Sequence, residues 1–278
     1  ILEVGDGERG LRQSDALFLH TKNIPELFEQ LGKENIDAVA YSARPRDVVG
    51  SYMPCFLAGE ATARAIAALH GVPVFAFSHQ AGHIEAAART CGEKLKDKFL
   101  SFHLSGGTTE LLLCQRNAEH GYACGIEGRT LDISAGQLID RIGVLLGLKF
   151  PCGAELEKLA AACDEKISVN VCVFGGNCNM SGAENKISKL ISDGFSKEYV
   201  AKYTLTFVGK TVLSMCEDAR KNHPDETILF AGGVMRNEYI RQMLTLRLDN
   251  ICFAKTELSS DNAVGTAYLG YAKLKGEI

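Results

Sequence analysis

Hydrophobic residues in the first half of the chain recur with two alternating periods, which predict strands and helices in turn. The short apolar runs typical of strands lie at residues 1–4, 36–42 and 72–78. The longer amphipathic stretches typical of helices lie at residues 14–31, 54–70 and 80–89. This order, βαβαβα, predicts a mostly parallel sheet that helices cover on both faces.

The second half repeats the same order and adds two strands at its start. Its strand-like runs lie at residues 98–105, 109–115, 121–127, 226–232 and 251–255. Its helix-like stretches lie at residues 131–146, 196–221, 237–248 and 262–274. When an inserted stretch at about residues 149–223 is set aside, the order is βββαβαβα, so two related units follow one another.

This repeat predicts an α/β fold with two lobes in tandem and a cleft between them. We place the first lobe at residues 1–95 and the second at residues 96–278, with the helical insertion inside the second. The first lobe lacks an N-terminal hairpin, and because the chain does not start with methionine we expect truncation or omission. The insertion contains a glycine- and asparagine-rich stretch at residues 174–187, which we interpret as a functional loop.

Composition and charge restrict the class of protein. Apolar residues make up 46% of the chain, charged residues 23%, and the net charge is −4. No apolar run approaches the roughly 20 residues that span a bilayer, so we expect no membrane association. A stand-alone nucleic-acid binder is usually basic, so a nucleic acid would need partner proteins or a local patch. The lysines that could form such a patch are Lys186, Lys189, Lys197 and Lys202.

Ten cysteines are scattered along the chain without a C-x-x-C pair. In a chain of this size, that pattern predicts reduced thiols and a cytoplasmic location, not a disulfide framework. Cys178 lies in the glycine- and asparagine-rich stretch and could be reactive, although a buried structural thiol is the more usual role.

Two histidines, His79 and His83, stand where a predicted strand ends and a helix begins. Their spacing of four places both imidazoles on one helix face, where they could share a divalent metal or be ordinary helix histidines. A carboxylate usually completes such a set. We predict that Asp261 does so, because it opens the last helix at the equivalent position of the second lobe. Aspartate there could also serve as a helix N-cap.

Two glycine-rich turns could cradle a phosphate. Ser105, Gly106 and Gly107 form a bend between two predicted strands, where backbone N–H groups and hydroxyls could face an anion. Gly232 and Gly233 leave another predicted strand and enter a helix, which suits a ligand at a helix N-terminus. The first turn could equally be a plain hairpin, and neither matches a Rossmann or Walker motif.

Further polar residues flank these turns. Asp140 lies four residues after Gly136 on the helix predicted at residues 131–146, on the side expected to face the cleft. We interpret Asp132, in the same segment, as a solvated residue on the helix face. Ser181 is a candidate substrate-loop residue or a surface turn serine.

In order along the chain, five motifs resemble those of the tRNA threonylcarbamoyladenosine synthase family, a glycoprotease-like group in the superfamily of actin, heat-shock ATPases and sugar kinases. Residues 79–83 resemble the family's H-x-E-G-H motif, and residues 105–109 resemble its S-G-G-[HN]-T motif. Residues 136–141 resemble its G-E-A-x-D-K motif. Residues 232–237 resemble its G-G-V-x-x-N motif, and residues 260–263 resemble its T-D-N-A motif. The resemblance covers nearly the whole chain and implies two actin-like (ribonuclease H-like) lobes.

The resemblance also implies a function and a site. One divalent metal, iron or zinc, would be held by His79, His83 and Asp261. ATP or an adenylate would contact the turn at residues 105–107 together with Gly136, Asp140 and Asn237. The reaction would move a threonylcarbamoyl group from the adenylate to adenine in tRNA. Partner proteins are expected, and the chain could form a homo- or hetero-dimer.

At several motif positions the chain differs from the family. Ala81 and Gln137 replace glutamates, Ala123 replaces a carboxylate, and Arg141 replaces a lysine. A divergent paralogue with the same metal site and another substrate is therefore one alternative. A non-catalytic scaffold that supports the synthase is a second, and a kinase-like phosphotransferase is a third. The metal ligands favour the enzyme over the scaffold, and a histidine pair does not suit the magnesium of a kinase.

Overall fold

The computed structural model describes residues 12–32, 34–92, 95–258 and 262–278. The chain divides into two compact units that interleave in sequence. Unit 1 comprises Ile1–Arg89, Arg116–Ala123 and Asp261–Ile278, and unit 2 comprises Thr90–Gln115 and Cys124–Ser260. The last helix, which the sequence assigned to the second lobe, thus groups with unit 1. The strand predicted at residues 1–4 lies outside the described residues, and the tandem lobes and the missing hairpin stay predictions.

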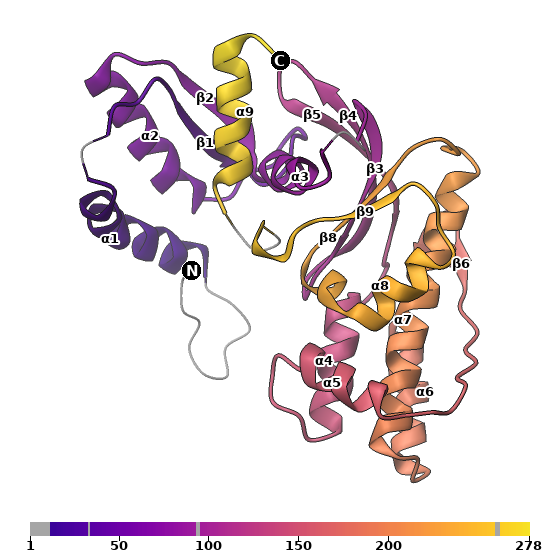
Figure 1. Cartoon of the computed structure of the whole chain (residues 1–278). Coiled ribbons are helices and arrows are strands. Elements are labelled where there is room, and N and C mark those ends of the chain that lie inside the picture. The colour runs from indigo at the N-terminus through magenta and orange to yellow at the C-terminus, as the bar shows by residue number, and fades with distance from the viewer. Residues whose placement is uncertain (1–11, 33, 93–94, 259–261) are drawn as a thin grey trace. The chain divides into compact units, whose positions relative to one another are not determined.

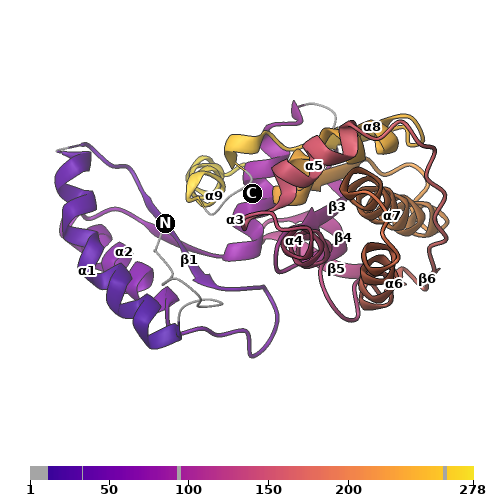
Figure 2. The same cartoon turned by 90° about the horizontal axis from the view of Figure 1, so that it is seen from below.

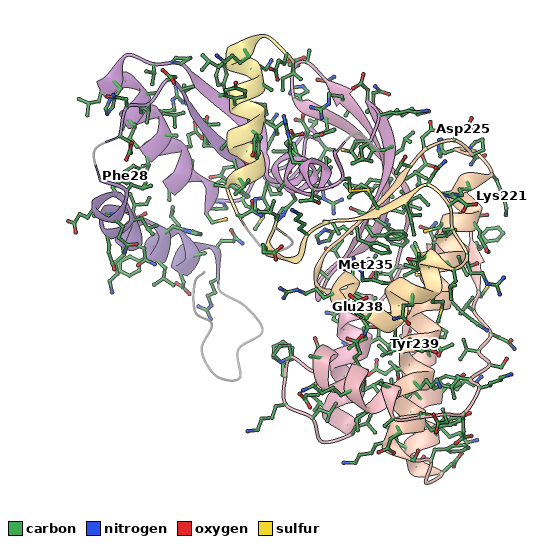
Figure 3. All side chains as sticks on the ribbon, viewed as in Figure 1. Phe28, Lys221, Asp225, Met235, Glu238 and Tyr239 are labelled. Carbon is green, nitrogen blue, oxygen red and sulfur yellow. A yellow bond between two sulfur atoms is a disulfide. The ribbon has the colours of Figure 1, made fainter. Side chains whose placement is uncertain are left out.

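Unit 1 is built on two parallel strands, β1 (Val39–Arg44) and β2 (Val74–Ser78). Its helices are α1 (Gln13–Leu31), α2 (Phe56–His70), α3 (His79–Arg89) and α9 (Val264–Lys275) (Figure 1). Each lies within a few residues of its predicted range. None of the nineteen residues of α1, all within the described part of the chain, is buried. Phe28, for example, lies on the surface of α1 with 43% of its area exposed (Figure 3).

In unit 1, α3 and α9 pack closely because glycines face each other. A Cβ atom on Gly265 would lie 1.9 Å from the backbone oxygen of Gly82, and a Cβ on Gly82 would lie 2.5 Å from Thr266 Oγ1. Only glycine therefore allows the two backbones to approach this closely. The contact falls between His79 and His83 on α3, so the last helix supports the histidine-bearing helix.

Unit 2 contains a sheet with the strand order β5-β4-β3-β8-β9. Its strands are β3 (Lys98–Leu104), β4 (Thr109–Asn117), β5 (Gly121–Arg129), β8 (Ile228–Ala231) and β9 (Ile251–Phe253). β3 pairs with β4 in the antiparallel sense and with β8 in the parallel sense, and β8 is parallel to β9. All five were predicted from the sequence, and they confirm a mixed α/β fold.

Helices surround a large apolar core in unit 2. They are α4 (Ala135–Leu145), α5 (Gly153–Ala161), α6 (Ser181–Ser192), α7 (Lys197–Arg220) and α8 (Glu238–Thr245). α6 and α7 lie side by side (Figure 2). Fourteen residues of α7 are buried, so this helix is the centre of the core. Although α7 spans 24 residues, no helix in the described part of the chain is long and apolar enough to cross a membrane.

The glycine- and asparagine-rich stretch at residues 174–187 is not one loop, as we had interpreted it. Its first part forms a short hairpin of β6 (Val173–Phe174) and β7 (Asn177–Cys178), and its second part is the start of α6. The glycines that suggested a loop, Gly175 and Gly176, form the hairpin turn with positive φ angles of 54° and 75°.

One pair of cysteines contradicts the expectation of reduced thiols throughout. Cys91, just after α3, and Cys252, in β9, form a disulfide in unit 2 with their Cα atoms 6.0 Å apart. None of the other eight cysteines forms a disulfide with a described residue. The two bonded residues are 161 positions apart in the sequence, so their spacing gave no sign that the fold brings them together.

Candidate functional site

His79 and His83 form a close pair at the start of α3 in unit 1. Their Nε2 atoms are 2.9 Å apart, and both side chains are half-buried. The Ser78 hydroxyl accepts a hydrogen bond from the Ala81 N–H, which satisfies a donor at the first turn of α3. The Phe56 ring lies edge-on to His79 with ring centroids 5.7 Å apart. The helix start and the Phe56 ring thus restrain the pair, as the four-residue spacing predicted.

The histidine pair fits a divalent metal. The 2.9 Å contact between the two Nε2 atoms is a hydrogen bond, and it is somewhat shorter than the roughly 3.3 Å that separates two nitrogens bound at about 2.0–2.1 Å to one tetrahedral metal, so a small shift of the rings would allow both to bind. The third predicted ligand, Asp261, lies outside the described residues, and among the described ones no three His, Cys, Asp or Glu side chains form a metal-binding group. The N-cap of α9 is Ala263, and the N-cap role suggested for Asp261 likewise concerns a residue outside the described ones.

A buried carboxylate that sequence analysis missed anchors α3 from within unit 1. Glu85 is completely buried, and its Oε1 accepts from Arg89 Nε at 2.6 Å. Its Oε2 accepts from the Tyr122 hydroxyl at 2.6 Å and lies 3.5 Å from an Arg116 nitrogen. The spacing of Glu85 and Arg89 does signal an ion pair. Only the fold brings in Arg116 and Tyr122, on β4 and β5.

The turn at Ser105, Gly106 and Gly107 in unit 2 packs directly against the N-terminus of α4. A Cβ atom on Gly136 would lie 2.5 Å from the Ser105 carbonyl oxygen, so glycine is required there. The Ser134 hydroxyl donates to the Gly106 carbonyl at 2.8 Å. By contrast, Cβ atoms on Gly106 and Gly107 would meet nothing within 4 Å. The predicted turn and Gly136 are therefore together, and the turn presents exposed backbone.

The second glycine turn lies beside the first. β3 and β8 are parallel neighbours with His103 opposite Ala231, so both turns leave the carboxyl ends of adjacent strands. Gly232 has φ +98°, and a Cβ there would lie 2.1 Å from the Leu104 carbonyl oxygen. Gly233 is exposed at the start of a 3-10 helix (Gly233–Arg236). Ligands commonly bind outside the carboxyl ends of parallel strands.

Two polar residues expected near the nucleotide, Asp140 and Asn237, and the motif residue Gln137 make hydrogen bonds within unit 2. Asp140 Oδ1 accepts from the Cys152 N–H at 2.8 Å, at the start of α5. Asn237 Oδ1 caps α8 by accepting from the Ile240 N–H at 3.0 Å. Gln137 completes a capping box with Ser134 at the start of α4, a role that glutamate and glutamine share.

α8 has a further cap that the sequence did not reveal. Glu157 Oε1, from α5, accepts from the N–H groups of Glu238 and Tyr239 at 2.6 and 3.2 Å. Figure 3 labels these two residues at the first turn of α8. Arg141, in place of the family's lysine, pairs with Glu184 at 2.9 Å.

Asp132 has a structural role that the sequence did not predict. It is exposed, as expected, but it precedes α4 and anchors the start of α6 instead of lying on a helix face. Its carboxylate accepts from the N–H groups of Met180 and Ser181 and from the Ser181 hydroxyl. Burial raises the pKa of Asp132, and these hydrogen bonds outweigh that effect, so the net pKa is lowered. Ser181 is therefore a helix-start residue held by Asp132.

Cys178 is 1% exposed, and burial raises the pKa of its thiol to about 11. Thiolate is the reactive form of cysteine, so this thiol is inert near neutral pH. The structural interpretation of Cys178 is confirmed.

The arrangement of strands and helices defines the class of fold. The chain resembles full-length HypF in its phosphate- and nucleotide-bound form, with a TM-score of 0.61 and 15% identity over 92% of this chain and 49% of that one. It also resembles component A of (R)-2-hydroxyglutaryl-CoA dehydratase from Acidaminococcus fermentans, with a TM-score of 0.51 and 17% identity over 75% and 73% of the two chains. These structural neighbours have the actin-like ATPase fold.

The family model described as tRNA N6-adenosine threonylcarbamoyltransferase (TsaD) matches residues 15–268, and the chain belongs to this family of transferases. A relative of that name from Archaeoglobus fulgidus is 26% identical, over 96% of this chain and 81% of its own length. Another, from Nanoarchaeum equitans, is 29% identical over 94% and 82%. The resemblance seen in the sequence is thereby confirmed.

Proposed function

We propose that the chain transfers a threonylcarbamoyl group from an adenylate to the exocyclic amine of adenine in tRNA. Membership of the transferase family, over residues 15–268, is the observation that carries this proposal. Relatives with the corresponding name cover 92% or more of the chain, so the match is not confined to a shared fold. No observation favours a scaffold or a phosphotransferase.

The two glycine turns of unit 2 are the proposed site of the adenylate phosphate. Gly106, Gly107 and Gly233 present exposed backbone at adjacent strand ends, where N–H groups can stabilise negative charge. Gly136 and Gly232 support the turns from behind because they allow close backbone contact. Asp140 and Asn237 would contact the nucleotide only by exchanging or sharing the hydrogen bonds that they make at helix starts.

The proposed metal ligands are His79, His83 and Asp261. The 2.9 Å separation of the histidine Nε2 atoms supports the first two. The close packing of Gly82 against Gly265 supports the third, since it fixes the helix that follows Asp261 against the histidine helix. When bound, an iron or zinc ion would act as a Lewis acid toward the carbamoyl carbonyl. The chain's own residues would orient the ligands and hold the adenylate phosphate.

The protein's metal content, measured by elemental analysis, tests the metal site. We expect about one metal per chain, lost in a His79→Ala/His83→Ala variant. A His20→Ala/His70→Ala variant is the matched control, because both histidines are exposed on other helices of unit 1. Equal metal content in all three proteins would contradict the site.

Transfer of labelled threonylcarbamoyl from its adenylate to tRNA tests the reaction, with partner proteins added where family members need them. We expect transfer by the wild type and the control and its loss in the His79→Ala/His83→Ala variant. Metal binding without transfer, under conditions that support a related enzyme, would favour a divergent paralogue with another substrate.

A further inference from the structure

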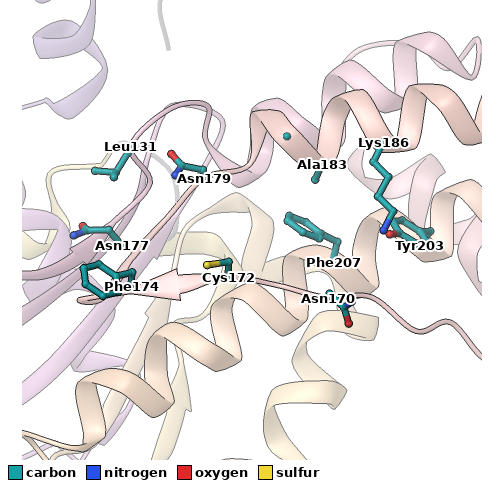
Figure 4. Close-up of a pocket in the computed structure, with 11 residues that line it drawn as sticks. Leu131, Asn170, Cys172, Phe174, Asn177, Asn179, Ala183, Lys186, Tyr203 and Phe207 are labelled. Atoms are coloured by element: carbon teal, nitrogen blue, oxygen red, sulfur yellow. The ribbon is translucent and has the colours of Figure 1, made fainter.

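Unit 2 contains a cavity of about 480 Å³ that the proposed reaction does not use. It lies among the β6–β7 hairpin, α6 and α7 (Figure 4). Its floor is apolar and buried, and consists of Ala183, Tyr203 and Phe207. Its size falls within the range of small-ligand pockets, about 300–1,000 Å³.

An exposed aromatic ring stands at the rim of this cavity on a firmly held support. Phe174, in β6, is 88% exposed. The hairpin that carries it is pinned, because Asp218 Oδ2 accepts from the Gly176 N–H at 2.7 Å. A Cβ atom on Gly128 would lie 2.1 Å from the Gly176 oxygen, so β5 and the hairpin are in backbone contact. These contacts fix the backbone of the hairpin, and the Phe174 ring that it carries is exposed to solvent.

Polar groups complete the rim. Exposed Asn170 and Asn179 line the cavity, and an amide presents both donors and an acceptor. Lys186 Nζ lies 5.7 Å from the centre of the Tyr203 ring, at the same cavity (Figure 4). The cavity thus combines flat aromatic surface, amide hydrogen-bonding groups and one cation.

We infer that this cavity binds an unpaired nucleotide of RNA. Aromatic rings stack on bases, amides match the edges of bases, and a lysine pairs with phosphate. The inference rests on the proposed function, since it supplies that reaction with a second contact to tRNA. A net charge of −4 disfavours RNA binding by charge alone, and this cavity would bind mainly by stacking instead.

Binding of a fluorescently labelled single-stranded RNA oligonucleotide, followed by anisotropy, tests the inference. In a Phe174→Ala variant we expect roughly 5- to 100-fold weaker binding, the loss of one stacked base. Phe150→Ala is the matched control, because Phe150 is 75% exposed in unit 2 and does not line the cavity. Equal binding by wild type and Phe174→Ala would overturn the inference, as would no RNA binding by the wild type.

A Lys186→Ala variant adds a readout of the phosphate contact. The slope of log Kd against log salt concentration should fall by about 0.7, the value for one phosphate contact on a single strand. Lys158→Ala, on α5, is the control, and its slope should match the wild type. An unchanged slope in Lys186→Ala would contradict the assignment of this lysine to phosphate.

The exposed thiol of Cys172, which lines the cavity, reports its occupancy directly. RNA should slow alkylation of Cys172 in the wild type, and equal protection in Phe174→Ala should need a roughly 5- to 100-fold higher RNA concentration. Protection by free nucleoside monophosphates but not by RNA would overturn the inference in favour of a small-molecule site. Threonylcarbamoyl transfer is measured separately. If the protein transfers the group but RNA does not protect Cys172, only the inference about this cavity is refuted. If RNA protects Cys172 but no transfer occurs, only the proposed reaction is refuted.

Discussion

The histidine helix of unit 1 and the glycine turns of unit 2 are held in place by partly different means. In unit 1, the histidine helix α3 is held by its glycine contact with α9 and, in addition, by a side-chain network around the buried carboxylate of Glu85. In unit 2, the two glycine turns depend on backbone contacts that only glycine allows, at Gly136 and Gly232. A metal ligand must be oriented as a side chain, whereas a phosphate-binding turn would use its backbone, so we expect side-chain anchoring to matter more for the histidines than for the turns.

The difference predicts where each part is vulnerable. A glycine contact tolerates no added carbon, because the neighbouring atoms belong to the backbone and cannot move aside. A side-chain network can partly rearrange, so its loss should cost less than a backbone clash. Substitutions in the two units therefore test the comparison directly.

The largest effect is expected from Gly232→Ala. The new Cβ would lie 2.1 Å from the Leu104 carbonyl oxygen, at a φ of +98° that L-residues rarely adopt. We expect the free energy of unfolding to fall by more than about 4 kcal/mol, the range of the most damaging single substitutions. Urea denaturation measures this change.

Gly233→Ala is the matched control for that variant. A Cβ at Gly233 would meet nothing within 4 Å, so we expect a change within about 0.5 kcal/mol. If the two variants proved equally stable, backbone contact would not be what holds the second turn.

The sequence revealed most of the fold because its signals are local. Every described strand and helix of the repeat was predicted within a few residues, and the glycine turns were found from their motifs. The division into units was less visible, since residues 116–123 and α9 join unit 1 through contacts distant in sequence. The sequence does not distinguish the hairpin at residues 173–178 from a loop, because glycine is typical of both loops and hairpin turns.

The second prediction concerns Glu85→Ala, in unit 1. The change removes a buried carboxylate and leaves Arg89, Arg116 and the Tyr122 hydroxyl without that acceptor. Breaking a buried ion pair by removing one partner typically costs about 3–5 kcal/mol, and because Arg89 is 42% exposed we expect the lower end of that range. Thermal and urea unfolding would measure the loss.

Glu60→Ala provides a closely matched comparison. Glu60 and Arg64 have the same spacing on α2, but this pair is exposed to solvent, so its loss should cost less than about 1 kcal/mol. Similar losses of unfolding free energy in the two variants would show that burial of Glu85 adds nothing to stability. The contrast between the units would then fail.

The site was less predictable than the fold, for a physical reason. His79 and His83 were found because both lie on one helix, and a spacing of four fixes their separation. Two partners of Glu85, Arg116 and Tyr122, come from β4 and β5, and Glu157 reaches α8 from α5, so no local pattern marks these contacts. The disulfide between Cys91 and Cys252 was missed in the same way.

The smallest effect is expected from Asp132→Asn, which tests whether a side chain matters in unit 2. Asp132 accepts hydrogen bonds from Met180 and Ser181, and its pKa is lowered from 3.8. A lowered pKa stabilises the folded state above the unfolded-state pKa, and this contribution is lost as the pH falls through the folded-state pKa. Because Asp132 is exposed, solvent screening limits the expected loss at pH 7 to about 1 kcal/mol.

Urea unfolding of wild type and Asp132→Asn across the acidic pH range would show this. The difference in unfolding free energy should be constant above about pH 5 and shrink below about pH 4. Asp193→Asn, at the other end of α6, is the control and should differ from wild type by less than about 0.5 kcal/mol. A loss at pH 7 as large as that of Glu85→Ala would show that unit 2 also depends on a side-chain anchor, and the contrast between the two units would then fail.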